Sequence, residues 1–303
     1  MTDYGKPVQF GYFLTPDASN QAQLIQIAQD IEKLGLDLVG IQDHPYQGRF
    51  LDTWTLMAMI AAKTERLRIF PDVTSLPLRP PAVMAKAAAT LDLLSSGRFE
   101  LGLGAGAFWD GIVAMGGPSR TPQEAVAALE EAIMVIRHMW STERAVSFKG
   151  QFYSLKGVHP GPVPAHPIGI WVGAYKPKMV NLIGRVADGW VPSLGYIAPD
   201  KIVEMQARID DAASAAGRYP AAIRRILNIG GRITNGGSVG LLNGPVSQWV
   251  EELTTLTLEY GMDTYVLAEN DINQVRCFAQ EIVPQVREEV ARHRNAAPIG
   301  GTD

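Results

Sequence analysis

Cysteine is nearly absent from this chain of 303 residues, in which Cys277 stands alone. One thiol cannot form a disulfide within the chain, which excludes the disulfide-stapled scaffolds of small secreted proteins and favours a reducing compartment. Cys277 has no CxxC partner, and unpaired cysteines usually pack like small hydrophobic side chains. We therefore expect Cys277 to have a structural role.

Long hydrophobic runs and clusters of positive charge are also missing. The longest apolar stretch, Leu56–Ala62, is far shorter than the roughly 20 residues of a membrane-spanning helix, and residues 1–10 lack the apolar segment of a signal peptide. The net charge is −4 without a basic stripe, which disfavours nucleic acid as a partner. The five histidines show no metal-ligand spacing such as HxxxH, so no metal site is expected. These absences predict a cytoplasmic protein whose partner is a small molecule.

Short β-rich runs alternate with helical patterns along the chain. In Gln21–Leu34, for example, apolar residues recur on one face with helical spacing, and Gly35 follows the last of them. Eight strands are expected, at Val8–Phe13, Asp37–Gln42, Leu67–Val73, Phe99–Leu103, Ile168–Val172, Gly189–Val191, Arg225–Ile229 and Thr264–Ala268. Helices are expected at Gln21–Leu34, Trp54–Lys63, Ala82–Leu94, Thr121–Trp140, Lys178–Val186, Asp200–Ala216, Val246–Tyr260 and Ile272–Val290.

This alternation predicts an α/β fold, a single (β/α)8 barrel of the TIM type, because strands separated by helices close into a parallel barrel. The barrel domain is expected to extend over residues 1–294, with a flexible tail at 295–303. The competing architecture is an open doubly wound sheet, which has a glycine-rich turn after its first strand. Here the first strand is followed by Leu14–Pro16 without glycine, which favours the barrel.

An insertion is expected after the fourth strand, where the alternation breaks. Thr121 and Glu124 form a capping-box pattern at the start of a long helix. After this helix, the extended runs Ala145–Phe148 and Gln151–Leu155 predict a β-hairpin. We expect this helix and hairpin to lie outside the barrel.

Polar residues end several of the expected strands, and this end of a barrel is where catalytic residues concentrate. Asp43 and His44 follow the second strand, and a histidine there can donate or accept a proton near neutral pH. Alternatively, Asp43 only caps a turn and His44 packs against Tyr46. The segment Asp72–Ser75 ends the third strand and leads into a proline-rich loop that contains Arg79.

Glycine-rich segments end the fourth and fifth strands. Gly102–Gly106 would let a ligand approach the backbone closely, although packing and turn geometry explain many such runs. Gly173–Pro177 precedes a helix, so its backbone donors, the helix N-terminus and Lys176 together suit a phosphate group. The alternative is an ordinary strand–helix turn with a solvated lysine.

Together these segments resemble the luciferase-like monooxygenase superfamily, which contains FMN-dependent monooxygenases and oxidoreductases that use the deazaflavin F420. The resemblance covers about the first 195 residues well and the remainder loosely. The segments that carry it are, in order, Gly40–His44, Pro77–Pro81, Ala87–Asp92, Leu94–Phe99, Gly102–Gly106, Ile170–Ala174 and Arg185–Trp190.

The resemblance implies a set of residues that bind the cofactor. A non-prolyl cis peptide bond is expected between Asp72 and Val73, behind the cofactor ring. The positions that correspond to the remaining cofactor contacts are Gly104, Gly106 and Asp110 after the fourth strand, and Gly173, Ala174, Tyr175 and Lys176 in the phosphate-binding turn.

The resemblance also implies that His44 faces the reactive ring and exchanges a proton as hydride moves, with Asp43 contacting the cofactor or holding the loop. An Asp-His pair after the second strand is more frequent in the F420-dependent branch, which favours F420 over FMN. The implied function is hydride transfer between reduced F420, or FMN, and a small organic substrate, in a homodimer or higher homo-oligomer. An FMN-dependent monooxygenase and a non-catalytic flavin-binding relative are the alternatives.

Three departures bear on the substrate and the phosphate turn. Ala107 stands where the sugar-phosphate dehydrogenase of the F420 branch has an acidic residue, and Gly48 where it has a tryptophan, which argues against that reaction. Tyr175 and Lys176 replace a Ser-Gly pair that is common in the phosphate turn. Aromatic residues in the loops, such as Phe108, would suit an apolar substrate.

Overall fold

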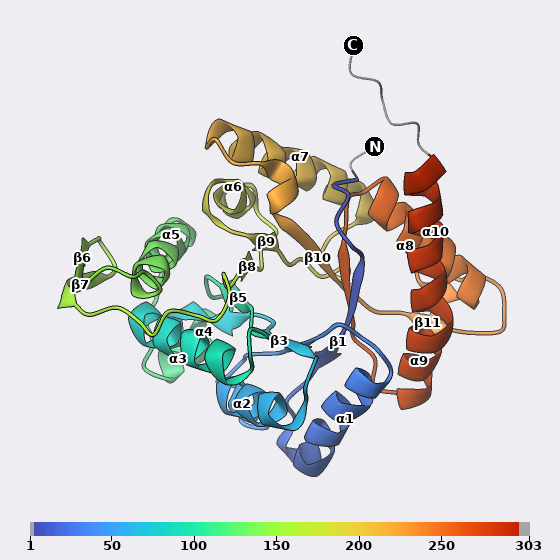
Figure 1. Ribbon diagram of the computed structural model, residues 1–303, viewed down its shortest axis with the longest axis horizontal. Coiled ribbons are helices and arrows are strands. Elements are labelled where there is room, and N and C mark those ends of the chain that lie inside the picture. The colour runs from blue at the N-terminus through green and yellow to red at the C-terminus, as the bar shows by residue number, and fades with distance from the viewer. Residues whose placement is uncertain (1–2, 297–303) are drawn as a thin grey trace.

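Parallel strands form a barrel-shaped sheet with helices around it in the computed structural model, which describes residues 3–296 (Figure 1). Within these residues the sheet has nine strands, in the order β3–β2–β1–β13–β10–β9–β8–β5–β4, and a parallel bridge joins Ile69 on β3 to Phe99 just before β5. The strands are β1 (Gln9–Leu14), β2 (Leu38–Ile41), β3 (Arg68–Pro71), β4 (Thr74–Ser75), β5 (Leu101–Gly104), β8 (Ile170–Val172), β9 (Gly189–Trp190), β10 (Arg224–Ile229) and β13 (Thr264–Leu267).

The third predicted strand is divided in two in this sheet. β3 pairs with β2, and β4 pairs with β5, so together they provide one strand of the barrel. Only Asp72 and Val73 separate them, and the peptide bond between these two residues is cis, as the resemblance predicted. All eight predicted strands are therefore present, and the predicted α/β barrel is confirmed.

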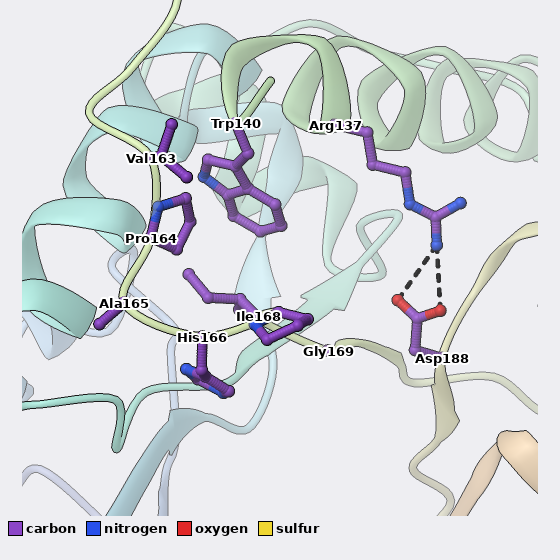
Figure 2. Close-up of a pocket in the computed structure, with 10 residues that line it drawn as sticks. Arg137, Trp140, Val163, Pro164, Ala165, His166, Ile168, Gly169 and Asp188 are labelled. Carbon is purple, nitrogen blue, oxygen red and sulfur yellow. Dashed lines mark hydrogen bonds and ion pairs between the residues drawn. The ribbon is translucent and has the colours of Figure 1, made fainter. Parts of the chain in front are cut away.

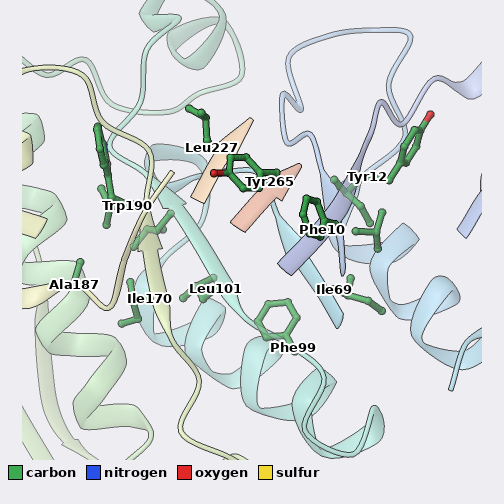
Figure 3. Close-up of a cluster of buried hydrophobic side chains, with 14 of the residues drawn as sticks. Phe10, Tyr12, Ile69, Phe99, Leu101, Ile170, Ala187, Trp190, Leu227 and Tyr265 are labelled. Atoms are coloured by element: carbon green, nitrogen blue, oxygen red, sulfur yellow. The ribbon is translucent and has the colours of Figure 1, made fainter. Parts of the chain in front are cut away.

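Side chains fill the interior of the barrel. Leu38, Phe70, Trp171, Ile226 and Val266 belong to one cluster of buried residues inside it. Their neighbours along the same strands belong to a larger cluster between the sheet and the helices, part of which Figure 3 shows. Successive side chains of a strand point to opposite faces, so β2, β3, β8, β10 and β13 contribute to both clusters.

Helices cover the outside of the barrel. Their bounds are α1 (Gln21–Lys33), α2 (Thr53–Lys63), α3 (Pro81–Leu94), α4 (Trp109–Ala114), α5 (Pro122–Met139), α6 (Pro177–Val186), α7 (Pro199–Ala215), α8 (Val246–Leu258), α9 (Ile272–Cys277) and α10 (Val283–Ala296). A π-helical turn, Phe278–Ile282, interrupts the last predicted helix. Since α10 continues to Ala296, the first two residues of the predicted tail are helical, and residues 297–303 lie outside the described residues.

The segment between β5 and β8 contains α4, α5 and a hairpin of β6 (Val146–Lys149) and β7 (Ser154–Val158). The hairpin is a two-stranded sheet of its own, next to α5 and away from the barrel strands (Figure 1). Thr121 and Glu124 form the predicted capping box at the start of α5.

The second strand of the hairpin begins later than the predicted Gln151–Leu155. Glu131 on α5 accepts hydrogen bonds from the backbone N–H groups of Gln151, Phe152 and Tyr153, at 2.7, 2.8 and 3.1 Å. These three residues are thereby held in the turn, which leaves Ser154–Val158 to form the strand.

Charged side chains connect the amino-terminal ends of the barrel strands. His166, in the connector before β8, has Nδ1 2.8 Å from Asp92 on α3 and Nε2 3.4 Å from Glu100 before β5. Glu100 also accepts the N–H of Gly169 at 2.6 Å. The hydrogen bond to Glu100 and the charges of Glu100 and Asp92 raise the pKa of His166, against the opposing effect of burial. The connector is thus held to α3 and β5 by a charge-assisted contact.

A cavity of about 520 Å³ lies beside this contact, and its lining includes Arg137, Trp140, His166 and Asp188 (Figure 2). Arg137 donates to both carboxylate oxygens of Asp188, at 3.0 and 3.1 Å. Asp188 directly precedes β9, so the cavity belongs to the amino-terminal end of the barrel. In barrels of this type this end contributes to stability, and the opposite end carries the chemistry.

We expect the contribution of His166 to stability to depend on pH. A histidine whose pKa is raised on folding stabilises the folded state fully below its unfolded pKa of about 6.5, and this contribution is lost as the pH rises through the folded pKa. His166→Ala should therefore lower the free energy of unfolding by about 2 kcal/mol near pH 6 and by less at higher pH.

Urea unfolding of the wild type and the variant across this pH range measures the difference. His293→Ala, which removes a histidine whose side chain is 53% exposed, is the control and should change stability little at any pH. A loss for His166→Ala that is the same at every pH would contradict the assignment.

Candidate active site

The carboxyl-terminal ends of the parallel strands bring together most of the predicted site residues. Asp43 and His44 follow β2, Asp72 and Val73 lie between β3 and β4, and Gly173 follows β8. These strands belong to one barrel, so their ends surround a common opening.

His44 lies half-buried among aromatic side chains. Its Nδ1 is 2.5 Å from the hydroxyl of Tyr46, and its ring packs edge-on against Phe108 with 5.5 Å between the ring centres. Burial lowers the pKa of His44, and the negative charge of Asp43 offsets this only in part. Burial raises the pKa of Tyr46 to about 12, so its hydroxyl keeps its proton. His44 is therefore a neutral imidazole near pH 7, and its Nε2 has no hydrogen-bond partner among the described residues.

Asp43 holds the surrounding loops together. Its carboxylate is 1% exposed and accepts hydrogen bonds from the N–H of Ser75 at 3.0 Å and from Arg79 at 3.3 Å. Arg79 also donates to Asp52 at 2.7 Å, and Asp52 caps α2 through the N–H of Thr55. Of the two roles that the sequence left open for Asp43, these contacts support holding the loop.

Val73 lies at the centre of the site, between two glycine-bearing strand ends. A Cβ atom at Gly104 would lie 2.9 Å from a methyl carbon of Val73, and one at Gly173 would lie 3.1 Å from the same carbon. The first distance is too short for a side chain and the second would force Val73 to shift, so these glycines allow the close approach of Val73. The result is a partly exposed apolar platform, with no side chain of β5 or of the turn after β8 on it, which suits one face of a flat ring.

Asp72 points into the barrel rather than toward the opening. Its Oδ1 accepts a hydrogen bond from Asn228 on β10 at 3.2 Å, and Asp72 as a whole is 8% exposed. Burial raises the pKa of Asp72 to about 7, and the hydrogen bond from Asn228 opposes this rise.

The other two residues predicted after the fourth strand have different environments. Gly106 has a φ of +102°, and a Cβ there would lie 2.8 Å from Pro77 and 2.9 Å from Trp109, so it is required by the packing of its loop. Asp110 is exposed in the first turn of α4, a helix that the sequence analysis missed. The contacts of neither residue indicate a ligand.

The predicted phosphate turn lies at the N-terminus of α6. The N–H groups of Ala174, Tyr175 and Lys176 have no hydrogen-bond partner among the described residues, and the side chain of Lys176 is exposed. Tyr175 turns back and accepts a hydrogen bond from the N–H of Ser193 at 3.0 Å. Free N–H groups at a helix N-terminus next to a lysine form a suitable site for an anion.

Arg79, Asp52, Ser193 and Asn228 take part in the site but were not among the predicted residues. The only sequence signal for Asn228 is its amide side chain within the otherwise apolar run Ile226–Ile229. Arg79 was noted in its loop without a partner, because its partners Asp43 and Asp52 are separated from it by 36 and 27 positions.

Comparisons with known proteins identify the family of this chain. The luciferase-like monooxygenase family matches residues 8–230. An F420-dependent glucose-6-phosphate dehydrogenase from Kineococcus radiotolerans is 32% identical over 232 residues, which are 75% of this chain and 68% of that protein. The chain therefore belongs to the luciferase-like monooxygenase family and is an enzyme of the oxidoreductase class.

Solved structures show the same fold at lower identity. An F420-dependent secondary alcohol dehydrogenase in complex with an F420-acetone adduct has a TM-score of 0.79 at 20% identity and covers 93% of this chain and 99% of its own. Riboflavin lyase with modified FMN has a TM-score of 0.80 at 15% identity and covers 98% of this chain and 94% of its own.

No helix in residues 3–296 combines the length and apolarity that a membrane crossing requires. The same residues contain no group of three or more His, Cys, Asp or Glu side chains placed to hold a metal ion.

Removal of Arg79 tests the role of Asp43. Arg79→Met should lower the free energy of unfolding by about 3 kcal/mol, because it leaves the buried carboxylate of Asp43 without its cation. Urea unfolding followed by tryptophan fluorescence measures this loss. The matched control is Arg49→Met, which breaks an exposed ion pair with Asp17 at 3.7 Å and should cost no more than about 0.5 kcal/mol. Equal losses in the two variants would show that Asp43 does not depend on Arg79.

Proposed function

We propose that this protein is an F420-dependent oxidoreductase that transfers hydride between F420 and a small organic substrate. The observation that carries the proposal is the position of His44, a neutral imidazole with a free Nε2 at the same barrel opening as the Val73 platform and the α6 N-terminus. The name of the relative from Kineococcus radiotolerans supports F420 as the cofactor. The Asp-His pair after β2 points the same way.

The residues around the opening suit the parts of such a cofactor. Val73, with Gly104 and Gly173 beside it, would support one face of the ring system. The free N–H groups of residues 174–176 and the Lys176 ammonium would hold the phosphate. When bound, F420 supplies or accepts the hydride.

His44 moves the proton that accompanies the hydride. When a substrate alcohol is oxidised, its carbon loses hydride and its hydroxyl proton passes to Nε2 of His44. In the reverse direction the imidazole returns this proton to the carbonyl oxygen. Asp43, fixed by Ser75 and Arg79, keeps His44 at the opening. Burial lowers the pKa of His44, which favours the neutral imidazole that can accept this proton.

The walls of the opening favour a substrate with an apolar part. Phe108 is 58% exposed, and its ring and that of Tyr46 pack against His44. Ala107 and Gly48 are both exposed and offer neither a charge nor an aromatic ring. The site therefore lacks the acidic residue and the tryptophan that the resemblance associates with a sugar-phosphate substrate. We propose a small alcohol or carbonyl compound as the substrate instead.

Cofactor titration distinguishes this function from the alternatives. Absorption and fluorescence titrations of the purified protein should give a dissociation constant for F420 at least about tenfold below that for FMN. Tighter binding of FMN, with oxygen consumed when reduced FMN is supplied, would support the FMN-dependent monooxygenase. Binding without turnover on any alcohol or carbonyl compound tested would support a non-catalytic relative.

Substitution of His44 separates proton transfer from cofactor binding. His44→Ala should lower turnover by about 10²- to 10⁴-fold, because it removes the general acid–base group, while the dissociation constant of F420 changes by no more than about twofold. Gly173→Val should have the opposite effect, since its side chain would collide with Val73 and displace the platform, which weakens F420 binding. Unchanged turnover in His44→Ala would mean that another residue transfers the proton, with Tyr46 as the first candidate.

A further inference from the structure

A chain of hydrogen bonds crosses the barrel beneath the proposed cofactor site. The hydroxyl of Tyr175 accepts the N–H of Ser193 at 3.0 Å, and the hydroxyl of Ser193 accepts from Asn228 at 3.2 Å. Asn228 also donates to Oδ1 of Asp72 at 3.2 Å. The chain of contacts therefore connects the turn after β8 with the break between β3 and β4. None of these groups takes part in the proton transfer assigned to His44.

This network is incomplete at its buried end. Oδ2 of Asp72 and Oδ1 of Asn228 are both buried and have no hydrogen-bond partner among the described residues. A Cβ at Gly40 would lie 3.0 Å from Oδ2 of Asp72, so this oxygen lies against β2 inside the barrel. A buried carboxylate without a partner for one oxygen is costly, whereas a neutral carboxylic acid carries no net charge to be desolvated.

No positive charge compensates Asp72. Among residues 3–296, no Lys, Arg or His nitrogen lies within 4.0 Å of its carboxyl group. The groups around it are Gly40 on β2, Phe70 on β3, Asn228 on β10 and, further away, Tyr175. Of these only Tyr175 titrates, and burial raises the pKa of its hydroxyl, so it stays neutral across the range of interest.

We propose that Asp72 is a neutral carboxylic acid beneath the cofactor site and that its ionisation opposes binding of the anionic cofactor. Asp72 is a positioning residue, since it is buried below Val73 and acts on the ligand through the platform and through its charge. The inference rests on the proposed function, because it concerns the same cofactor and the same opening. Electroneutrality beneath the site is the feature that the anion requires.

The direction of the pH dependence follows from linkage. Burial raises the pKa of Asp72 to about 7, so the acid is mostly neutral below this pH and mostly ionised above it. A bound anion repels the ionised form and raises the pKa of Asp72 further, which means that binding takes up a proton. The affinity for F420 should therefore fall by about tenfold between about pH 6 and about pH 8.5.

Asp72→Asn tests this coupling, because asparagine has the shape of the neutral acid and cannot ionise. The dissociation constant of F420, measured by fluorescence titration across the same pH range, should stay at its low-pH value in the variant and rise in the wild type. Asp263→Asn is the matched control, since Asp263 is a buried carboxylate before β13 at the opposite end of the barrel. It should leave the pH profile of binding unchanged.

Two results would overturn the proposal. The same pH profile in the wild type and in Asp72→Asn would assign the dependence to another group. Weaker binding by the variant at every pH, with the fold intact, would show that the ionised carboxylate is the form that favours the cofactor.

Infrared spectroscopy of the wild type without cofactor tests the protonation state separately and needs no variant. The carbonyl stretch of a buried carboxylic acid should be present near pH 6 and lost with a midpoint near pH 7, and its absence at pH 6 would overturn the proposal. Failure of both F420 and FMN to bind the wild type would instead overturn the proposed function, while the infrared titration would still decide the state of Asp72.

Discussion

The filled interior of the barrel is the constraint on which the rest of the site depends. Leu38, Phe70, Trp171, Ile226 and Val266 occupy the inside of the sheet, so no ligand can enter the barrel from its opening. At the carboxyl-terminal end, the inward-facing polar groups Asp72 and Asn228 meet in the last layer before the opening. A flat ligand has to rest on top of this layer, and Val73 supplies the surface that it meets.

The two ends of the barrel use their charged groups differently. At the amino-terminal end, Asp92, Glu100 and Asp188 each have a histidine, an arginine or backbone donors as partners, and these pairs connect neighbouring segments. At the carboxyl-terminal end, burial lowers the pKa of His44 and raises that of Asp72, so two groups with opposite shifts lie in one site. Environments that separate pKa values in this way are typical of acid–base chemistry.

The barrel was predictable from the sequence because its strands are buried on both faces and appear as short apolar runs. The features that were missed or misplaced depend on contacts between distant segments. The second hairpin strand begins later than predicted because Glu131 binds the turn before it, 20 residues away in the sequence. Asp43 is bound by Arg79, which is 36 residues away. The cis bond after Asp72 was predicted from the family resemblance alone, since no local pattern indicates it. The Asp72–Asn228 pair joins residues 156 positions apart and had no sequence signal beyond two polar residues in apolar strands.

A crystal structure of the protein with F420 bound would test the central claim, that the cofactor lies on the Val73 platform at the carboxyl-terminal end of the barrel. The account predicts one ring face against Val73, the phosphate within hydrogen-bond distance of the N–H groups of residues 174–176, and Nε2 of His44 directed at the substrate side of the ring. A cofactor seated instead in the cavity that Arg137 and Asp188 help to line, at the other end of the barrel, would contradict it.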